Sequence, residues 1–146
     1  MRKSLKDAVE QKAIELLEEH KLRRTKNRLE VLKALIGQNK PLAHSDIMSR
    51  LKGKRFDRVS VYRSLQRFVE KGIVHKAYIS DRNDMFEIAD RCGEDYCHPH
   101  FSCRVCKETI CMNDISVPVI RNLGKGFIPS RQKIFIEGTC PKCSDR

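Results

Sequence analysis

The segment DRVSVYRSLQRFVEKGIVHKAYISDRNDMFEI, residues 57–88, joins a helical pattern to a hairpin pattern. Its first half carries apolar residues at helical spacing: Val61, Leu65, Phe68 and Val69. Asp57 is a good N-cap for this helix, and Gly72 ends it. Two extended runs follow, residues 73–79 and 85–88, with a polar turn between them. This order predicts a winged helix-turn-helix, in which the helix before the wing is the recognition helix.

The residues before this segment also follow a helical pattern. Apolar positions at helical spacing predict a first helix over residues 5–17. Thr25 is a good N-cap for a second helix, which ends at Gly37, and a short third helix ends at Gly53. These helices and the two strands after them place the chain in the α+β class.

The expected recognition helix has a polar face opposite its apolar stripe. The side chains on or beside this face are Ser60, Tyr62, Arg63, Ser64 and Arg67. Arginine can make a bidentate contact to guanine, and tyrosine can stack or touch a thymine methyl group. An ordinary solvated helix face is the alternative interpretation of the same pattern.

The charge of the chain is distributed unevenly. Its 146 residues carry a net charge of +11, most of which lies before Asp84, whereas the rest is close to neutral. A basic part joined to a nearly neutral part suggests a polyanion-binding domain beside a second domain. We place the border at a hinge near Ala89–Tyr96, which gives domains over residues 1–90 and 91–146.

All seven cysteines lie in the second domain, between Cys92 and Cys143. Four of them form two short-spaced doublets: Cys103, Cys106, Cys140 and Cys143. Two such doublets suit a closed tetrahedral Zn²⁺ site of the structural kind. The N-terminus leads into no apolar core of a signal peptide, and no run approaches 18 apolar residues, so we expect a cytoplasmic protein without a membrane partner.

The second domain reads as short strands around one helix. The β-prone runs are residues 101–103, 109–112 and 132–137. A helix is expected over Ile115–Leu123, with Pro118 in its first turn and Gly124 after it. The domain is therefore expected to be a small α/β unit that bound metal stabilises.

Taken together, the motifs resemble those of the ferric uptake regulator family. The resemblance rests on five ordered segments: residues 59–65, residues 72–74, residues 86–88, the run His98-x-His100-x2-Cys103-x2-Cys106, and Cys140-x2-Cys143. It implies a homodimeric bacterial repressor that binds palindromic operator DNA. The N-terminal winged helix would contact DNA, and the C-terminal α/β domain would dimerise.

The resemblance also implies roles for single residues. Tyr62 and Arg63 match the pair with which the family reads the groove. Arg23 and Arg28 match basic residues that contact the DNA backbone or minor groove. Ser60 and Arg67 join this set from their place on the helix face. The four doublet cysteines match the family's structural zinc site.

The regulatory metal site is expected at His75, Cys92, His98 and His100, a set that resembles the zinc uptake regulator branch. One thiolate and three imidazoles suit tetrahedral Zn²⁺. Glu87 is an alternative ligand, since it stands where the iron branch places a glutamate; an iron- or peroxide-responsive regulator that uses Fe²⁺ or Mn²⁺ therefore remains the alternative.

Two other classes of protein explain the sequence less well. Zinc deaminases pair a His-x-Glu motif with Pro-Cys-x-x-Cys, but Thr139 precedes Cys140, and no glutamate stands in the required frame. Catalytic zinc also needs an open coordination position, which four cysteines fill. A zinc-ribbon adaptor would explain the doublets but not the basic helix. We therefore expect no enzymatic activity and no small organic substrate.

Overall fold

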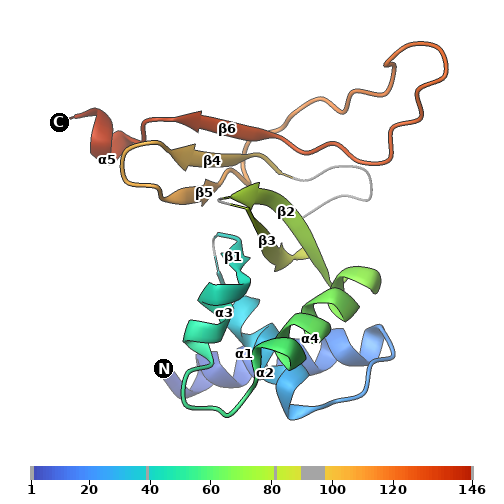
Figure 1. The fold of residues 1–146 in the computed structure, drawn as a ribbon, viewed down its shortest axis with the longest axis vertical. Coiled ribbons are helices and arrows are strands. Elements are labelled where there is room, and N and C mark those ends of the chain that lie inside the picture. Colours follow the sequence, from blue (N-terminus) through green and yellow to red (C-terminus); the bar gives the residue numbers. More distant parts are fainter. Residues whose placement is uncertain (1, 39, 81, 90–97, 146) are drawn as a thin grey trace. The chain divides into compact units, whose positions relative to one another are not determined.

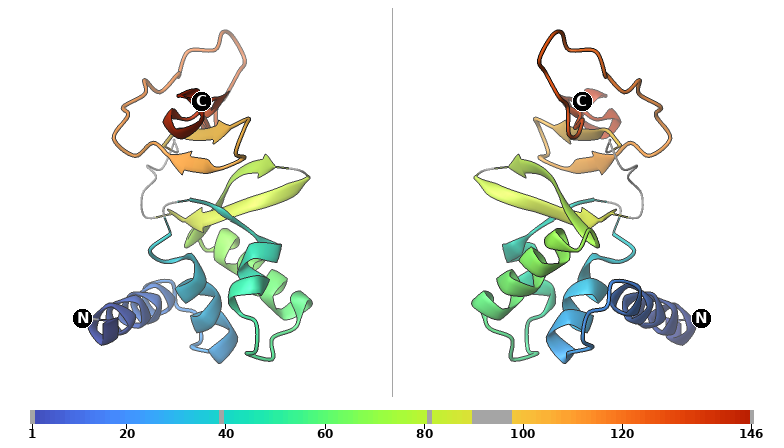
Figure 2. Two further views of the ribbon diagram at one scale, coloured as in Figure 1. Left: turned by 90° about the vertical axis from the view of Figure 1, so that its left-hand side faces the viewer. Right: turned by 90° about the vertical axis from the view of Figure 1, so that its right-hand side faces the viewer.

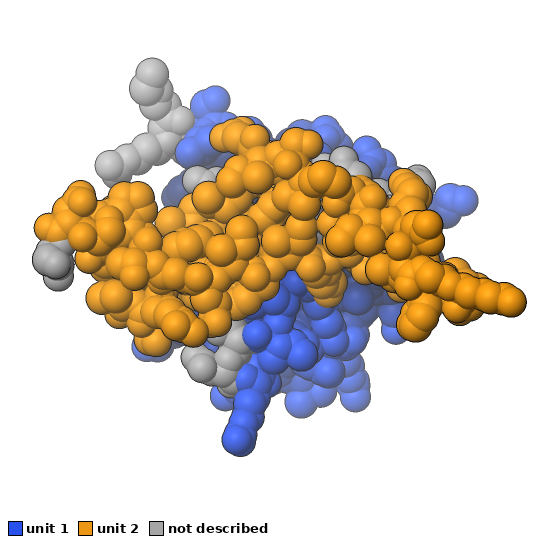
Figure 3. All heavy atoms as spheres, turned by 90° about the horizontal axis from the view of Figure 1, so that it is seen from above, with its two compact units in different colours: residues 1–89 blue, residues 90–146 orange. Residues whose placement is uncertain are grey.

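The computed structural model describes residues 2–38, 40–80, 82–89 and 98–145. The chain divides into two compact units, residues 1–89 and 90–146, which Figure 3 colours separately and which are described one at a time below. None of the helices described is long and apolar enough to cross a lipid bilayer.

Unit 1 is a winged helix, as the sequence predicts (Figures 1 and 2). In chain order its elements are α1 (Arg2–Glu19), α2 (Lys26–Leu35), β1 (Leu42–Ala43), α3 (His44–Arg50), α4 (Arg58–Glu70), β2 (Val74–Ser80) and β3 (Asn83–Ile88). The predicted recognition helix is α4, and the predicted wing strands are β2 and β3.

The helix boundaries follow from local capping chemistry. The Thr25 hydroxyl accepts a hydrogen bond from the Arg28 amide at 3.3 Å and so caps α2. The Asp57 carboxylate accepts one from the Ser60 amide at 2.8 Å and caps α4. Beyond α4, Gly72 has a φ of 74°, which favours glycine and turns the chain into the wing. Both predicted N-caps are confirmed.

The wing has a third strand that the sequence did not predict. β1 pairs antiparallel with β3, and β3 pairs antiparallel with β2, so the strand order is β1-β3-β2. Leu42 lies opposite Phe86 in this sheet, and both side chains are buried. The pairing attaches the wing to the start of α3, because β1 leads directly into that helix.

The core of unit 1 lies between the helices and the wing. α4 buries the side chains of Val61, Leu65 and Phe68 in it. Phe86 of the wing and Ile47 of α3 belong to the same cluster. Since one face of α4 is anchored in this way, its other face is held at a fixed orientation on the surface of the unit.

Unit 2 is a small mixed sheet followed by a single helical turn. Its elements are β4 (His100–Cys103), β5 (Thr109–Cys111), β6 (Phe135–Gly138) and α5 (Pro141–Ser144). The strand order is β5-β4-β6, with β4 antiparallel to β5 and parallel to β6. All three strands match predicted runs, although β6 is shorter than expected.

The helix predicted over Ile115–Leu123 is wrong, because these residues have irregular backbone between β5 and β6. Pro118 disfavours helical backbone in the residue before it. Val117 and Val119 on either side are β-branched and add to this preference. The Gln132 side chain bridges the segment instead, donating to the Pro118 carbonyl at 3.0 Å and accepting from the Ile120 amide at 2.7 Å.

We predict that Phe68→Ala lowers the free energy of unfolding of unit 1 by about 3–5 kcal/mol, because it leaves a cavity in the centre of the core. Urea denaturation of the full chain measures the change. Val59→Ala is the matched control on the same helix: Val59 is 57% exposed, so its loss should change stability by no more than about 0.5 kcal/mol. Equal losses in both variants would contradict the assignment of the core.

Candidate metal centre and nucleic-acid interface

Four cysteines converge at one end of unit 2, and we call them the cysteine tetrad: Cys103, Cys106, Cys140 and Cys143. Cys103 ends β4, and Cys106 lies in the turn to β5. Cys140 and Cys143 come from the start and the interior of α5. The parallel pairing of β4 with β6 sets Cys103 opposite Gly138 and so brings the second doublet to the first.

The geometry of the cysteine tetrad fits a zinc ion. The four sulfur atoms all lie within 4.8 Å of one another. Cys106 Sγ and Cys140 Sγ are 3.8 Å apart. A tetrahedron with Zn–S bonds of about 2.3 Å places its sulfurs about 3.8 Å apart, so little movement is needed to complete the site.

The thiols of the tetrad differ strongly in acidity. The backbone amides of Cys140 and Cys106 lower the pKa of the Cys103 thiol to about 6. Hydrogen bonding with the Cys140 thiol and burial raise the pKa of Cys143 to about 12. The Cys103 thiol therefore favours the thiolate form at neutral pH, whereas deprotonating several thiols of the tetrad requires a nearby cation.

Unit 2 holds a second group of potential ligands on its sheet. Potential ligand atoms of His98, His100 and Cys111 lie within 4.8 Å of one another. Both imidazoles are buried, and their ring centroids are 4.5 Å apart. Cys111 joins them because it pairs directly with His100 across β4 and β5. The sequence alone does not predict this approach, since strand pairing cannot be read from the position of Cys111.

In unit 1 the wing carries a pair formed by His75, which is buried, and Glu87, which is partly buried. They are directly opposite in β2 and β3, and His75 Nε2 lies 2.6 Å from a Glu87 carboxylate oxygen. Metal-binding histidines commonly donate a hydrogen bond from the second ring nitrogen to a carboxylate. Glu87 can therefore orient His75 or act as a ligand itself. Cys92, the remaining predicted ligand, lies outside the described residues.

The exposed face of α4 carries the residues predicted to read bases. Tyr62 is 49% exposed, and Arg63 is exposed beside it. Ser64 was expected on this face, but that expectation is wrong. Its side chain is buried, and its hydroxyl donates to Asn27 Oδ1 at 2.5 Å, which joins α4 to α2.

The other predicted DNA contacts have partners within unit 1. The Ser60 hydroxyl donates to the Asp57 carboxylate at 2.6 Å, as part of the cap of α4. Arg67 pairs with Glu70 at 2.9 Å on the surface, a kind of contact that a phosphate group can displace at little cost. Arg28 donates to the Arg23 carbonyl at 3.0 Å, so the two arginines lie together before and within α2.

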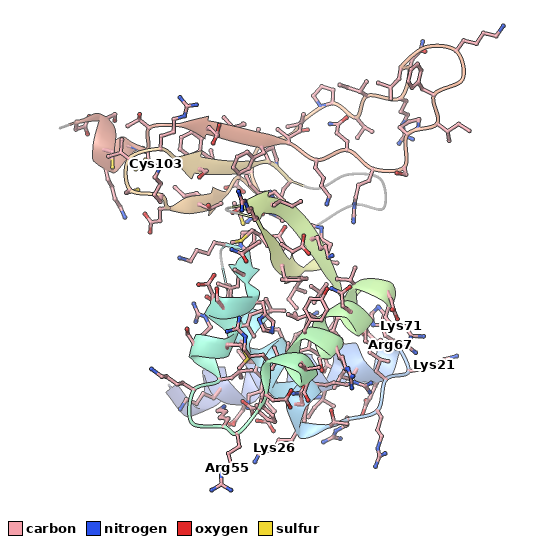
Figure 4. All side chains as sticks on the ribbon, in the orientation of Figure 1. Lys21, Lys26, Arg55, Arg67, Lys71 and Cys103 are labelled. Atoms are coloured by element: carbon pink, nitrogen blue, oxygen red, sulfur yellow. The ribbon has the colours of Figure 1, made fainter. Side chains whose placement is uncertain are left out.

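Further basic side chains are exposed on unit 1. In Figure 4, Lys26 and Arg55 project from the lower end of unit 1, whereas Lys21, Arg67 and Lys71 lie toward its right-hand side. Of these five residues, only Arg67 is among the DNA contacts expected from the sequence, although the net charge of the first half indicates a basic surface. Exposed basic side chains on the same unit as α4 are suited to contacts with phosphate groups.

The comparisons with known proteins agree with this architecture. The model of the Ferric uptake regulator family matches residues 19–125. A zinc uptake regulator complexed with zinc and DNA has a TM-score of 0.66 at 20% identity, covering 96% of this chain and 95% of its own.

Two ferric uptake regulators share the same fold. The ferric uptake regulator from Francisella tularensis with iron has a TM-score of 0.63 at 26% identity, covering 84% of this chain and 95% of its own. The regulator from Helicobacter pylori, whose structure reveals three functional metal binding sites, has a TM-score of 0.62 at 21% identity. That match covers 97% of this chain and 95% of the other.

We predict that Cys103→Ser and Cys140→Ser each remove about one tightly held zinc ion per chain and lower the melting temperature of unit 2, because the tetrad loses a ligand. Elemental analysis and thermal melting measure both effects. Val105→Ser is the control: it changes an exposed side chain in the same turn without touching a sulfur. Full zinc content in either cysteine variant would show that the tetrad is not the structural site.

Proposed function

Because the chain belongs to the ferric uptake regulator family, we propose that it is a zinc-responsive repressor that binds palindromic operator DNA as a homodimer and controls zinc uptake genes. The family consists of metal-dependent transcription regulators rather than enzymes. The observation that carries the zinc assignment is the pair of soft ligand clusters in unit 2, the cysteine tetrad and the group of His98, His100 and Cys111.

In this proposal unit 1 is the DNA-binding domain. Tyr62 and Arg63 of α4 enter the major groove and contact base edges, with Ser60 and Arg67 at the margin. Arg23 and Arg28 contact the backbone or the minor groove. What supports this is the exposure of Tyr62 and Arg63 on a helix whose opposite face is anchored in the core.

The tetrad would hold a structural Zn²⁺, and a second, regulatory site would draw its ligands from both units. We assign His75, Cys92, His98 and His100 to that site, with Cys111 as a further thiolate. Imidazole and thiolate ligands favour Zn²⁺ over harder metals. Glu87 is the observation that favours Fe²⁺ or Mn²⁺ instead, since its carboxylate touches His75 and would be a hard ligand.

Regulation would follow from where these ligands lie in the chain. A cation bound there ties side chains of the wing and of unit 2 to one centre and so restricts the angle between the units. Two recognition helices in a dimer can dock together only when their spacing matches successive major grooves. A coupling of about 1–3 kcal/mol per site is typical for such linkage.

Unit 2 would supply the dimer contact. Large apolar side chains are exposed in its irregular segment and along β6, including Leu123, Phe127 and Phe135; Ile128 is 95% exposed. Such a surface on a small unit is characteristic of an interface. Homodimerisation through this face in the cytoplasm is therefore part of the proposal.

For DNA reading we predict that Arg63→Ala weakens binding to the preferred duplex by about 1–3 kcal/mol and relaxes base preference at one position in each half-site. Arg23→Ala should weaken binding on all sequences and flatten the salt dependence. Fluorescence anisotropy on a duplex selected from a random library measures both. Arg104→Ala, an exposed arginine of unit 2, is the control. Equal losses on selected and random DNA for Arg63→Ala would rule out base reading by α4.

For metal sensing we predict that His98→Ala and Cys92→Ser keep the tetrad zinc but abolish the gain in operator affinity on adding metal. Glu87→Gln discriminates between metals, because it keeps an oxygen for His75 yet loses the charge that a hard metal needs. Under the zinc assignment Glu87→Gln should change the response little. If it silences the response and Cys92→Ser does not, the chain is an iron or peroxide sensor.

A further inference from the structure

His44, the first residue of α3, makes a side-chain hydrogen bond to the recognition helix. Its Nε2 atom lies 3.0 Å from the carbonyl oxygen of Arg58, in the first turn of α4. A carbonyl oxygen can only accept, so Nε2 carries the proton and donates. The position of His44 in the sequence gave no sign of this bond, because Arg58 lies 14 residues further along the chain.

The same histidine also contacts the residue expected to read bases. The rings of His44 and Tyr62 are 6.1 Å apart between centroids and inclined by 72°, an edge-to-face arrangement. In an α-helix the Arg58 carbonyl is the acceptor for the amide four residues on, which belongs to Tyr62. His44 is therefore linked to Tyr62 in two ways. The two rings are in contact, and the Arg58 carbonyl that accepts from His44 Nε2 also accepts from the Tyr62 amide.

These contacts bear on recognition because the Tyr62 side chain is half exposed. An exposed side chain samples several rotamers, and fixing one of them costs conformational entropy when DNA binds. A neighbour that already favours the reading rotamer lowers that cost. His44 is well placed to do so, since its own ring is held by the hydrogen bond to Arg58 and edge-to-face aromatic contacts have a preferred geometry.

We propose that His44 is a positioning residue for DNA recognition, which presets the Tyr62 ring on α4 before the helix enters the groove. This inference rests on the proposed function, because it assumes that Tyr62 contacts bases. A purely structural role for His44 is the competing explanation. The contact between α3 and α4 does not depend on His44, however, because Ile47 and Leu65 are buried in the common core.

The test is a double-mutant cycle between His44 and Tyr62, measured as operator affinity. The probe is a duplex selected from a random library by the metal-loaded full chain, with a random-sequence duplex as reference. His44→Ala should lower affinity for the selected duplex about 3- to 10-fold and leave the reference duplex unaffected. Tyr62→Ala should cost up to about 3- to 10-fold less in the His44→Ala background than in the wild type, since the Tyr62 ring is no longer preset there.

Two further variants separate the ring contact with Tyr62 from the hydrogen bond to the Arg58 carbonyl. They also keep the test valid if His44→Ala is poorly folded. His44→Phe keeps a ring against Tyr62 without the hydrogen bond, and His44→Gln keeps a donor without the ring. Each should recover part of the affinity. His20→Ala is the matched control, since His20 also bonds a backbone carbonyl, that of Leu16 at 2.9 Å, in the same unit; it should leave operator affinity unchanged.

The outcomes distinguish this inference from the proposed function. If Tyr62→Ala costs the same in both backgrounds, His44 does not position Tyr62, although α4 still reads DNA. If Tyr62→Ala and Arg63→Ala cost nothing in the wild type, base reading by α4 is wrong, and the inference is wrong with it. An equal loss from His44→Ala on the selected and the random duplex would make His44 a structural residue.

Discussion

Unit 2 depends on four cysteine sulfurs held within 4.8 Å of one another, which can all lose their protons only when a cation binds among them. The sheet has only three short strands, and its connection from β5 to β6 is irregular, so its own core supplies little stability. A cation at the tetrad would stabilise the thiolates and join the ends of β4 and β6 through α5. The pKa values of Cys103 and Cys143, about 6 and about 12, show how unequally the thiols hold their protons without one.

Unit 1 depends instead on its apolar core, which holds the exposed polar face of α4 in one orientation. Phe68 and Leu65 anchor one face of α4, and the Asp57 cap defines where the helix begins. Through its contact with Tyr62, His44 would extend this fixed orientation from the core to a side chain on the surface. Binding to DNA would then require little rearrangement of the reading residues, which helps specificity more than it helps non-specific affinity.

Local signals in the sequence were enough for the elements that depend on local chemistry. Thr25, Asp57 and Gly72 marked helix boundaries because caps and glycine turns act over a few residues. The two doublets predicted the tetrad because metal ligation requires that spacing. Contacts between distant residues could not be predicted in this way. The pairing of Leu42 with Phe86, the burial of Ser64 against Asn27 and the approach of Cys111 to His100 all depend on tertiary packing. The helix expected over Ile115–Leu123 does not form, because Pro118, expected in its first turn, disfavours helical backbone at Val117, and the β-branched neighbours add to this preference.

The central claim is that a second metal ion, apart from the one at the tetrad, controls DNA binding. The most direct measurement is the operator affinity of the full chain, purified with its tetrad metal in place, while Zn²⁺, Fe²⁺ or Mn²⁺ is added in separate titrations. We expect operator affinity to rise by about 10-fold or more as a further equivalent of metal per chain binds, with Zn²⁺ achieving this at the lowest free concentration. Full operator affinity with the tetrad metal alone, unchanged by any added ion, would contradict this claim.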